Sequence, residues 1–388
     1  MSALSGSERT GFTSVLVVGL GLIGGSIAAA ARRLDPAPVV YGVDVDPSAL
    51  LVAAERGLVD AAAQPDVART SGWLSGGEID LIVLATPVAR TVEWLGILAD
   101  AGYAGVVTDV ASTKSGVVQA AESLPGASFT FIGGHPMAGS ERSGIDAARE
   151  DLFDGAYYVL TPGAAAGAEQ FRMLHSFVSA LGARVVSVDP GAHDQAVAII
   201  SHVPHVAAAA LIELASARAT AGGDDLLRLA AGGFKDMTRI AAGSPDLWTG
   251  ICLDNAEAIS SGLADLRAVI AEFEALVDSR DSHGMHRWLD RASEVRRSLP
   301  AQWVPATSRL SELTLPVSDR PGVISAVTTA VGRAGCNIED IEIDHRSEDS
   351  AVLRLVLTDE GDVASLIRDL EDRGFAPQLS PLEEGSAQ

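Results

Sequence analysis

The stretch VLVVGLGLIGGS, residues 15–26, constrains the fold more than any other part of the chain. Gly19, Gly21 and Gly24 have the G-x-G-x-x-G spacing, which alone is a weak signal. Here the glycines follow a strand-like apolar run and open an Ala-rich helical segment, the context of a dinucleotide-binding turn. Gly19 permits the tight turn, Gly21 lets the backbone approach a pyrophosphate, and Gly24 lets the helix pack on the strand. The stretch therefore predicts a Rossmann-type domain.

The predicted cofactor is NAD. Asp44 lies twenty residues beyond Gly24, at the end of the second strand-like run, where an acidic side chain binds the ribose hydroxyls. A carboxylate there repels the 2′-phosphate of NADP, and no Arg or Lys follows at once in DVDPSAL. A glycine-rich turn of another α/β fold stays open as the alternative. Further predicted cofactor contacts are Leu22, Ile23, Thr86 and Pro87.

Runs of the same apolar kind recur at 39–44, 81–86, 105–110, 129–134, 156–161 and 183–189. Most are uninterrupted rather than alternating, as expected of strands covered on both faces. The segments between the first few are long enough to hold helices, so βαβ units and a mainly parallel sheet are predicted. Residues 12–189 form the predicted NAD-binding domain.

Two further domains are predicted, which makes the fold class α/β with an all-α and a ferredoxin-like addition. Residues 190–300 have helical patterns throughout, and Pro204 should kink one long helix by freeing the carbonyl of Ile200. The long apolar helices of 194–275 have more hydrophobic surface than a small domain buries alone, so a homodimer is expected. Residues 310–380 follow the order β-α-β-β-α-β of the ferredoxin-like fold, after a linker at 300–309.

The net charge of -23, from 28 basic and 51 acidic residues, disfavours nucleic acid and anionic lipid as partners. It equally repels an anionic substrate, which would need locally placed Arg or Lys. Cys252 and Cys336 give neither a disulfide framework nor a metal-ligand spacing, so no metal is predicted. The chain shows no signal-peptide pattern and no charge-free apolar run of about 20 residues, so a cytoplasmic protein is expected.

Four clusters look chemical. FIGGHPMAGSERSG (131–144) places His135 among glycines and a proline, which argue against a helix and for a shaped loop. DVASTK (109–114) contains Ser112, whose alternative role is a helix N-cap. The other two clusters are SHVPH (201–205) and GGFKDMTRIAAGSPDLW (232–248).

Behind a Rossmann motif, FIGGHPMAGSERSG, SHVPH and GGFKDMTRI resemble, in that order, the prephenate/arogenate dehydrogenases of tyrosine biosynthesis. The third domain resembles an ACT domain, with DRPGVISAV as its ligand-loop motif. The resemblance covers roughly residues 12 to 380. It implies an NAD-dependent oxidation of a cyclohexadienol with loss of the ring carboxylate. Prephenate would give 4-hydroxyphenylpyruvate, and arogenate would give tyrosine.

The resemblance also implies roles for residues. His135 matches the family's catalytic histidine, and a neutral imidazole suits uptake of the hydroxyl proton. Ser112 matches the serine that hydrogen-bonds the substrate hydroxyl and that histidine. Arg239 matches the arginine that holds the ring carboxylate, a task for a bidentate guanidinium. The remaining predicted substrate contacts are His205, Glu141, Lys235, Gly232 and Trp248.

Several of these assignments stay open. Lys235 could be a solvated surface lysine, and Trp248 could be a core residue. His202 and His205 share a helix face, but no third ligand has convincing spacing for zinc, and a buried structural role is the alternative for His202. Glu141 could pair with the ammonium of arogenate, so the loop alone does not decide between the two substrates.

An ACT-like domain implies amino-acid binding, with tyrosine as the expected effector and phenylalanine, or no ligand, as the alternatives. The residues at that site would be Asp319, Pro321, Gly322 and Asn337. A purely dimerising module is the alternative. Two other classes of protein are alternatives to the dehydrogenase. A β-hydroxyacid dehydrogenase would need a catalytic lysine in the helical domain, and a non-catalytic NAD and amino-acid sensor would not need Ser112, His135, His205 and Arg239 together.

Overall fold

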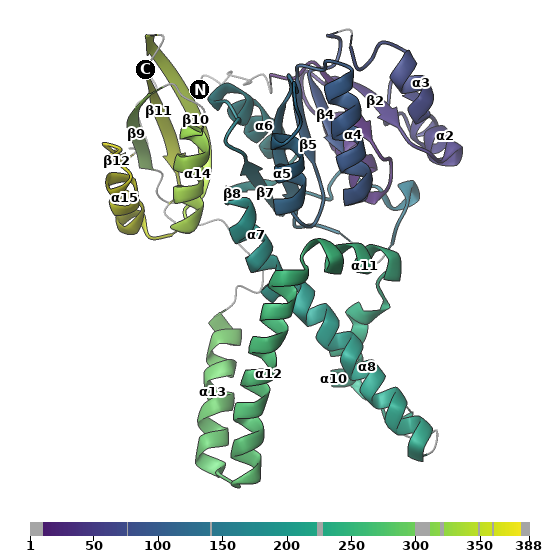
Figure 1. Cartoon of the computed structure of the whole chain (residues 1–388), viewed down its shortest axis with the longest axis vertical. Helices are drawn as coiled ribbons and strands as arrows, with labels where there is room; N and C mark the ends of the chain where they lie inside the picture. The colour runs from purple at the N-terminus through teal and green to yellow at the C-terminus, as the bar shows by residue number, and fades with distance from the viewer. Residues whose placement is uncertain are drawn as a thin grey trace, which may run out of the picture. The chain divides into compact units, whose positions relative to one another are not determined.

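A computed structural model describes residues 11–75, 77–139, 142–222, 228–298, 311–318, 322–347, 350–358 and 361–381. The chain divides into two compact units. Met1–His193 together with Ser308–Gln388 make the first, which we call the nucleotide unit, and Asp194–Thr307 make the second, the helical unit. Figure 1 labels the elements of both.

The nucleotide unit contains an eight-stranded sheet in the order β3-β2-β1-β4-β5-β6-β7-β8. All pairings are parallel except β6 with β7. The order of the first strands is that of a Rossmann fold, in which the order of successive strands reverses between β1 and β4 while the strands stay parallel. This confirms the predicted fold class. The strands are β1 (Ser14–Val18), β2 (Val39–Val43), β3 (Ala61–Ala63), β4 (Leu81–Leu84), β5 (Val106–Asp109), β6 (Thr130–Pro136), β7 (Tyr157–Pro162) and β8 (Arg184–Ser187).

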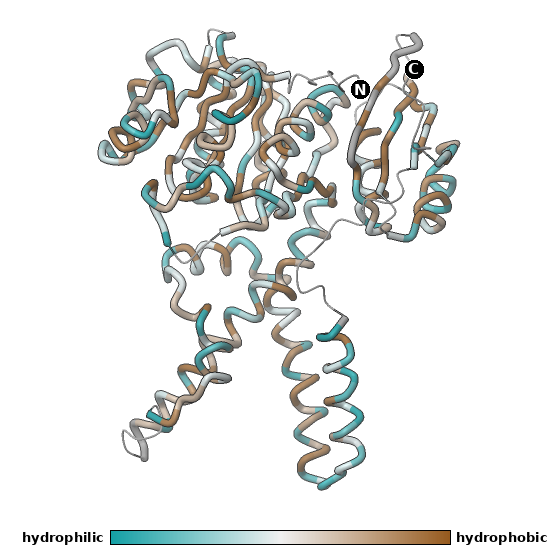
Figure 2. The backbone as a smooth tube through the Cα atoms, turned by 180° about the vertical axis from the view of Figure 1, so that it is seen from behind, coloured by the Kyte–Doolittle hydropathy of each residue, from teal (hydrophilic) through white to brown (hydrophobic). Residues whose placement is uncertain are grey.

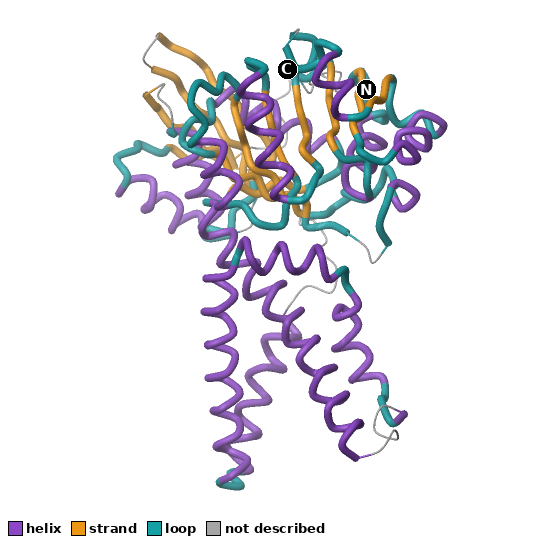
Figure 3. Tube along the Cα trace, turned by 45° about the vertical axis from the view of Figure 1, so that its right-hand side comes forward, coloured by secondary structure: helices purple, strands orange, loops and turns teal. Residues whose placement is uncertain are grey.

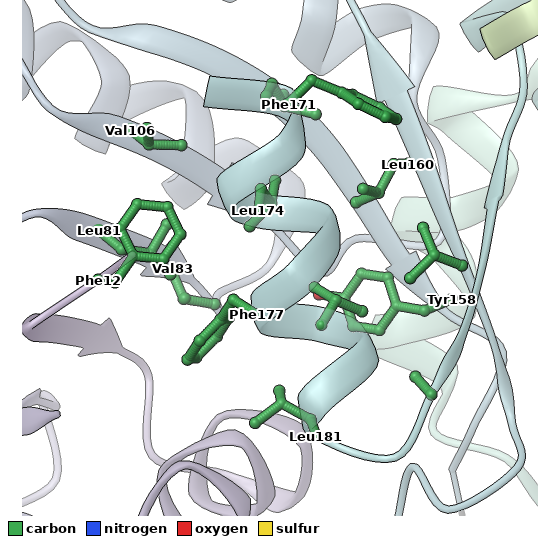
Figure 4. Packing of buried hydrophobic residues seen from close by; sticks show 14 of the residues in the cluster. Phe12, Leu81, Val83, Val106, Tyr158, Leu160, Phe171, Leu174, Phe177 and Leu181 are labelled. Carbon is green, nitrogen blue, oxygen red and sulfur yellow. The ribbon is translucent and has the colours of Figure 1, made fainter. Parts of the chain in front are cut away.

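The sheet is buried because helices cover it. Every residue of β1, β4 and β5 is buried, in keeping with their uninterrupted apolar sequences. Helix α6 projects Phe171, Leu174 and Phe177 into the core beside Tyr158 of β7 (Figure 4). The helices of this unit before the boundary are α1 (Leu22–Ala31), α2 (Pro47–Glu55), α3 (Pro65–Thr70), α4 (Val88–Asp100), α5 (Ser115–Glu122) and α6 (Ala168–Ala180), with a 3₁₀ turn η1 (Ile145–Ala147).

Strand β6 confirms the strand predicted at 129–134 and extends it through His135 and Pro136, so the loop predicted around His135 is wrong at these two residues. The two glycines serve close packing instead of a turn. A Cβ on Gly134 would meet the carbonyl oxygen of Asp109 at 2.5 Å and Oγ1 of Thr108 at 2.9 Å. A Cβ on Gly133 would collide with Oγ1 of Thr161. Strand β6 therefore fits between β5 and β7 only with glycine at both positions.

The helical unit consists of helices in the part of it that the structure describes (Figure 3). The boundary between the units falls within α7 (Pro190–Val197). The long helix predicted to kink because of Pro204 is interrupted by a π-helical turn, η2 (Ala198–His202). The α-helix resumes as α8 (Val203–Gly222), which has Pro204 as its second residue. A wider turn accommodates the missing proline N–H. The other elements are α10 (Gly232–Thr238), the 3₁₀ turn η3 (Arg239–Ala242), α11 (Pro245–Asp254), α12 (Ala256–Asp278) and α13 (Ser282–Ser298).

By length and composition alone, Pro190–Ala219 could cross a membrane, with a mean hydropathy of 1.7 and 33% of its most apolar window buried. The sequence predicts no membrane span. The stretch carries four buried polar side chains, those of His193, Asp194, His202 and His205. Polar groups buried by surrounding protein are typical of a core helix, so we interpret the stretch as packed against protein.

The C-terminal segment has the predicted β-α-β-β-α-β order and the sheet order β10-β11-β9-β12. It packs on the Rossmann segment within the same unit. Ser187 Oγ donates to Thr328 Oγ1 at 2.9 Å, Ser325 Oγ donates to the Pro162 carbonyl at 2.8 Å, and His175 lies 3.1 Å from the Ile338 carbonyl. Its elements are β9 (Ser311–Ser318), α14 (Val323–Arg333), β10 (Ile338–Ser347), β11 (Ser350–Leu357), α15 (Val363–Asp372) and β12 (Gln378–Pro381).

Candidate functional site

The glycine turn between β1 and α1 has the shape that its sequence predicts. Gly19 has a φ of +94°, a conformation that favours glycine. A Cβ on Gly24 would collide with the Gly19 carbonyl, whereas a Cβ on Gly21 would meet nothing within 4 Å. The backbone at Gly21 is therefore open to a ligand, and the first residues of α1, Leu22 and Ile23, present the helix N-terminus to it.

Asp44 follows β2 and braces this turn. Its Oδ2 accepts the N–H of Leu20 at 2.6 Å, and its Oδ1 accepts the N–H of Asp46 at 2.8 Å. A carboxylate has about four acceptor positions, so both oxygens can still accept ribose hydroxyls. Thr86 and Pro87 follow β4 on the other side of Gly19, and a Cβ on Gly19 would collide with the neighbouring Ala85 carbonyl. These residues fit a dinucleotide with free ribose hydroxyls.

The strand register brings the predicted chemical residues to one edge of the sheet. Val18 of β1 lies opposite Leu84 of β4, which lies opposite Asp109 of β5, and β6 continues the parallel series. The carboxyl ends of parallel strands meet at the same edge, which is where open α/β sheets bind ligands. The glycine turn, Asp44, Thr86, Ser112 and His135 all lie at or just beyond these ends.

A buried ion pair holds the segments of Ser112 and His135 together. Asp109 and Lys114 both have no exposed side-chain surface, and Lys114 Nζ donates to Asp109 Oδ2 and, at 2.7 Å, to the Gly134 carbonyl. Asp109 Oδ1 accepts the Gly134 N–H at 3.0 Å, and its Oδ2 accepts the Ala111 N–H at 3.0 Å. The backbone on both sides of the pair, before Ser112 and before His135, is therefore fixed by one carboxylate.

Ser112 is not a helix N-cap, contrary to the alternative considered for it. Helix α5 begins at Ser115, and Lys114 holds the N-cap position. Ser112 is half-buried in the turn that the Asp109 carboxylate shapes. Its hydroxyl is thus not committed to capping the helix.

His135 ends strand β6 beside a second histidine. Its Nδ1 lies 2.9 Å from Nε2 of His193, and the two rings meet edge to face with centroids 5.1 Å apart. His193 is buried, in the first turn of α7. Strand β7 connects the two, because Val159 lies opposite His135 and Leu160 lies opposite Ser187 of β8, which leads into α7.

The helical unit holds a second group of predicted residues. His205 stacks on Trp248 with ring centroids 3.4 Å apart and an interplanar angle of 12°. Burial lowers the pKa of His205, so its imidazole is neutral near pH 7. Its buried Nδ1 has no hydrogen-bond partner among the described residues. A Cβ on Gly243 would meet Nε1 of Trp248 at 2.6 Å, so the stack requires glycine there.

His202 has the buried structural role considered for it. Its Nδ1 lies 3.2 Å from Nδ2 of Asn255, which also donates to the Asp194 carbonyl at 2.8 Å. Since an amide nitrogen donates, His202 Nδ1 accepts.

Among the described residues no group of three His, Cys, Asp or Glu side chains could hold a metal ion. Burial, aided by Asp362, raises the pKa of Cys336 to about 11, which keeps that thiol protonated.

Gly232, Lys235 and Arg239 follow one another along α10 and into η3, and all three are exposed in this structure. Lys235 and Arg239 are four residues apart, which places them on one helical face. The structure thus keeps the two cations adjacent and accessible. Three predicted contacts, Glu141, Asp319 and Pro321, lie outside the described residues.

A cavity of about 450 Å³ lies at the opposite edge of the Rossmann sheet, lined by Phe12, Asp80 and Tyr103 among others. These residues precede or flank the amino ends of the strands, far along the strands from Gly19 and His135. The cavity therefore takes no part in the site.

Four site residues escaped the sequence analysis: Asp109, Lys114, His193 and Asn255. Asp109 and Lys114 bound the cluster DVASTK, where an acidic residue at a strand end and a lysine five positions later could have signalled a pair. No local signal marks His193 or Asn255, because their partners are 58 and 53 residues away.

Three family models match the chain in order. Residues 27–187 match the prephenate dehydrogenase nucleotide-binding domain, residues 189–291 match the prephenate dehydrogenase dimerization domain, and residues 313–375 match the ACT domain. Together they cover most of the chain, in the order of its described elements.

Individual proteins agree with these matches. The prephenate dehydrogenase of Bacillus subtilis (strain 168) is 34% identical over 357 residues, which are 90% of this chain and 93% of that protein. The crystal structure of prephenate dehydrogenase from A. aeolicus in complex with hydroxyphenyl propionate and NAD+ has a TM-score of 0.69 and 28% identity, and covers 74% of this chain and 98% of that one. The crystal structure of Synechocystis arogenate dehydrogenase has a TM-score of 0.63 and 35% identity, and covers 74% of this chain and 100% of that one. The chain belongs to the prephenate dehydrogenase family and carries an ACT domain after the family's nucleotide-binding and dimerization domains.

Proposed function

We propose that the protein is an NAD-dependent prephenate dehydrogenase, which converts prephenate to 4-hydroxyphenylpyruvate and CO2. The observation that carries the proposal is the position of His135 and Ser112 at the same sheet edge as the glycine turn. Membership of the family and the similarity to the Bacillus subtilis enzyme support this choice of reaction.

The proposed chemistry assigns one task to each residue. NAD+, held by the turn at Gly19 and Gly21 and by Asp44, would supply the hydride acceptor for the carbinol carbon of the substrate. Ser112 orients the substrate hydroxyl, and neutral His135 takes up its proton. When the ring loses CO2, the electron pair of the broken C–C bond moves through the ring to this oxygen, which recovers the proton from His135. No net proton is released, so His135 must give the proton back as readily as it accepts it.

The helical unit would supply the binding groups. Arg239 would hold the ring carboxylate with its planar guanidinium, and Lys235 would add positive charge against the net charge of -23. His205, which is neutral and stacked on Trp248, would hydrogen-bond the substrate through a ring nitrogen. Gly232 would keep the start of α10 free of a side chain beside the substrate.

A second candidate substrate is arogenate, because the Synechocystis arogenate dehydrogenase is 35% identical to the chain. Glu141 would then pair with the ammonium group that arogenate has in place of the keto group of prephenate. Initial rates of NADH formation with each substrate test the proposal. Turnover of prephenate alone would support it, preference for arogenate would change the substrate and assign Glu141 to the ammonium, and turnover of neither would refute a dehydrogenase function.

Regulation and assembly belong to the same proposal. Tyrosine would bind the ACT domain near Gly322, the N-cap of α14 with a φ of +86°, and near buried Asn337. If tyrosine inhibits the purified enzyme but not the Asn337→Ala variant, the effector site is supported. If tyrosine competes with prephenate in the unchanged enzyme and in the variant alike, it binds at the active site instead. A cytoplasmic location stays a prediction.

A homodimer through the helical unit is proposed because apolar residues recur along its helices (Figure 2) and several of their side chains are exposed. They include Ile199, Ile200, Leu214, Val269, Ile270 and Val277. Exposed apolar surface of this extent is typical of an interface, and the matching family model describes a dimerization domain. Analytical sedimentation tests the proposal. It is supported if the unchanged protein sediments as a dimer and the Ile270→Glu variant sediments as a monomer.

A further inference from the structure

His193 is buried in the nucleotide unit, yet neither the glycine turn nor the groups that bind substrate account for it. Its backbone N–H donates to the Asp189 carbonyl at 2.8 Å, and the Asp189 side chain accepts the Ala192 N–H at 3.0 Å. These bonds fix the first turn of α7. Because the imidazole is also almost fully buried, at 2% exposure, its direction toward His135 is fixed by the fold.

The 2.9 Å contact between His135 Nδ1 and His193 Nε2 requires that one of these nitrogens carries a proton and the other accepts it. A neutral imidazole has a single N–H. If His193 donated, His135 would hold its own proton on Nε2, and that nitrogen could not take another from a substrate. If His135 donates through Nδ1, its Nε2 is an acceptor and is ready to act as a base.

We propose that His193 is a positioning residue that selects the base-competent tautomer of His135. This inference rests on the proposed function, in which His135 takes up the hydroxyl proton. His193 accepts the Nδ1–H of His135 at its Nε2 before, during and after that uptake, and it keeps its own proton on Nδ1.

A histidine in this position differs in effect from a carboxylate. An acidic partner would stabilise the imidazolium strongly and so hinder the return of the proton. A neutral imidazole orients the ring with less stabilisation of its charged form. This suits a reaction in which His135 returns the proton to the ring oxygen. Charged groups on the elements that carry the pair include Asp189 and Asp194 near the start of α7, and Asp109 and Lys114, which bond the backbone of Gly134 next to His135.

Two variants at one position separate orientation from packing. His193→Gln retains a side-chain acceptor, whereas His193→Leu fills the space without one. We expect the leucine variant to lose about 10- to 100-fold in kcat, a part of the 10²–10⁴ that a positioned base contributes. Both KM values should stay within about twofold, since the substrate contacts are untouched. The glutamine variant should recover most of the rate.

The acid limb of the pH profile of kcat provides a second readout. Without an acceptor at Nδ1 the imidazolium of His135 is less stabilised, so this limb should move to lower pH in His193→Leu and stay in place in His193→Gln. Equal losses in both variants, or losses mainly in KM, would overturn the positioning role.

A third readout needs neither substrate nor cofactor. Nitrogen NMR of the free enzyme labelled at histidine reports which ring nitrogen of His135 carries the proton, with the signal assigned through His135→Asn. We expect the proton on Nδ1 in the unchanged enzyme and a mixture of tautomers in His193→Leu. A proton on Nε2 in the unchanged enzyme would overturn the proposal. If the proton lies on Nδ1 but the enzyme turns over neither prephenate nor arogenate, the proposed function is refuted while the tautomer assignment stands.

Discussion

Replacing Lys114 by methionine tests whether the buried ion pair is essential to the nucleotide unit. Methionine is close to lysine in length but has no charge and no donor. It would leave the Asp109 carboxylate fully buried, with the N–H groups of Ala111 and Gly134 as its remaining partners among the described residues, and it would remove the Lys114 donor from the Gly134 carbonyl. Removing one member of a buried pair costs about 3–5 kcal/mol, and a typical domain has only about 5–15 kcal/mol in total.

The chain offers a matched control, because only two of its 28 basic residues are lysines. Lys235 is exposed, so Lys235→Met should change the free energy of unfolding by no more than about 0.5 kcal/mol. Urea unfolding followed by near-ultraviolet circular dichroism measures both variants. A loss below about 1 kcal/mol in Lys114→Met would mean that the hydrogen bonds from Ala111 and Gly134 suffice to hold the carboxylate, and the reasoning would be refuted.

Three further predictions concern other parts of the site. Asp44→Ala should reduce kcat/KM with NAD by about tenfold or more, because it removes one charged hydrogen bond to the ribose. The value of kcat/KM with NADP should change less. An unchanged ratio of the two values would mean that Asp44 does not contact the ribose. Gly243→Val should destabilise the helical unit by about 1–3 kcal/mol by overpacking, because a Cβ at this position would meet Nε1 of Trp248 at 2.6 Å. An unchanged unfolding midpoint would show that the Trp248 side chain can shift at no cost in stability. Because burial lowers the pKa of His205, the unfolded chain binds a proton there that the folded protein does not, and stability should fall as pH drops through about 6.5. His205→Phe should show a shallower fall when urea midpoints are compared on either side of that pH, and an equal fall would assign the effect to other groups.

The parallel sheet could be predicted because its strands are buried on both faces and read as apolar runs. Strand β3 could not, because AAA has no β propensity of its own and pairs only through its register with β2. The kink near Pro204 follows from the missing N–H, yet its form as a π-helical turn depends on packing that the sequence does not display.

The site residues also divide into those that the sequence predicts and those that it does not. The turn at Gly19 and the carboxylate of Asp44 have fixed spacings within one βαβ unit, so sequence alone locates them. His193 meets His135 only because β7 runs antiparallel to β6 and parallel to β8. Glycines 133 and 134 suggested a turn because glycine is common in turns, whereas here they admit neighbouring backbone and side chains. Contacts set by strand pairing over long separations have no local signature.

The near absence of lysine has a practical consequence for chemical labelling. An amine-reactive reagent has two lysine side chains to modify, and Lys114 is shielded from attack in the folded protein, because its side chain has no exposed surface and its Nζ donates to Asp109 and to the Gly134 carbonyl. Acylation should therefore mark exposed Lys235 before Lys114. Protection of Lys235 by a bound anion can then be followed as one peptide in a mass spectrum, and the later appearance of label on Lys114 would time the opening of the nucleotide unit.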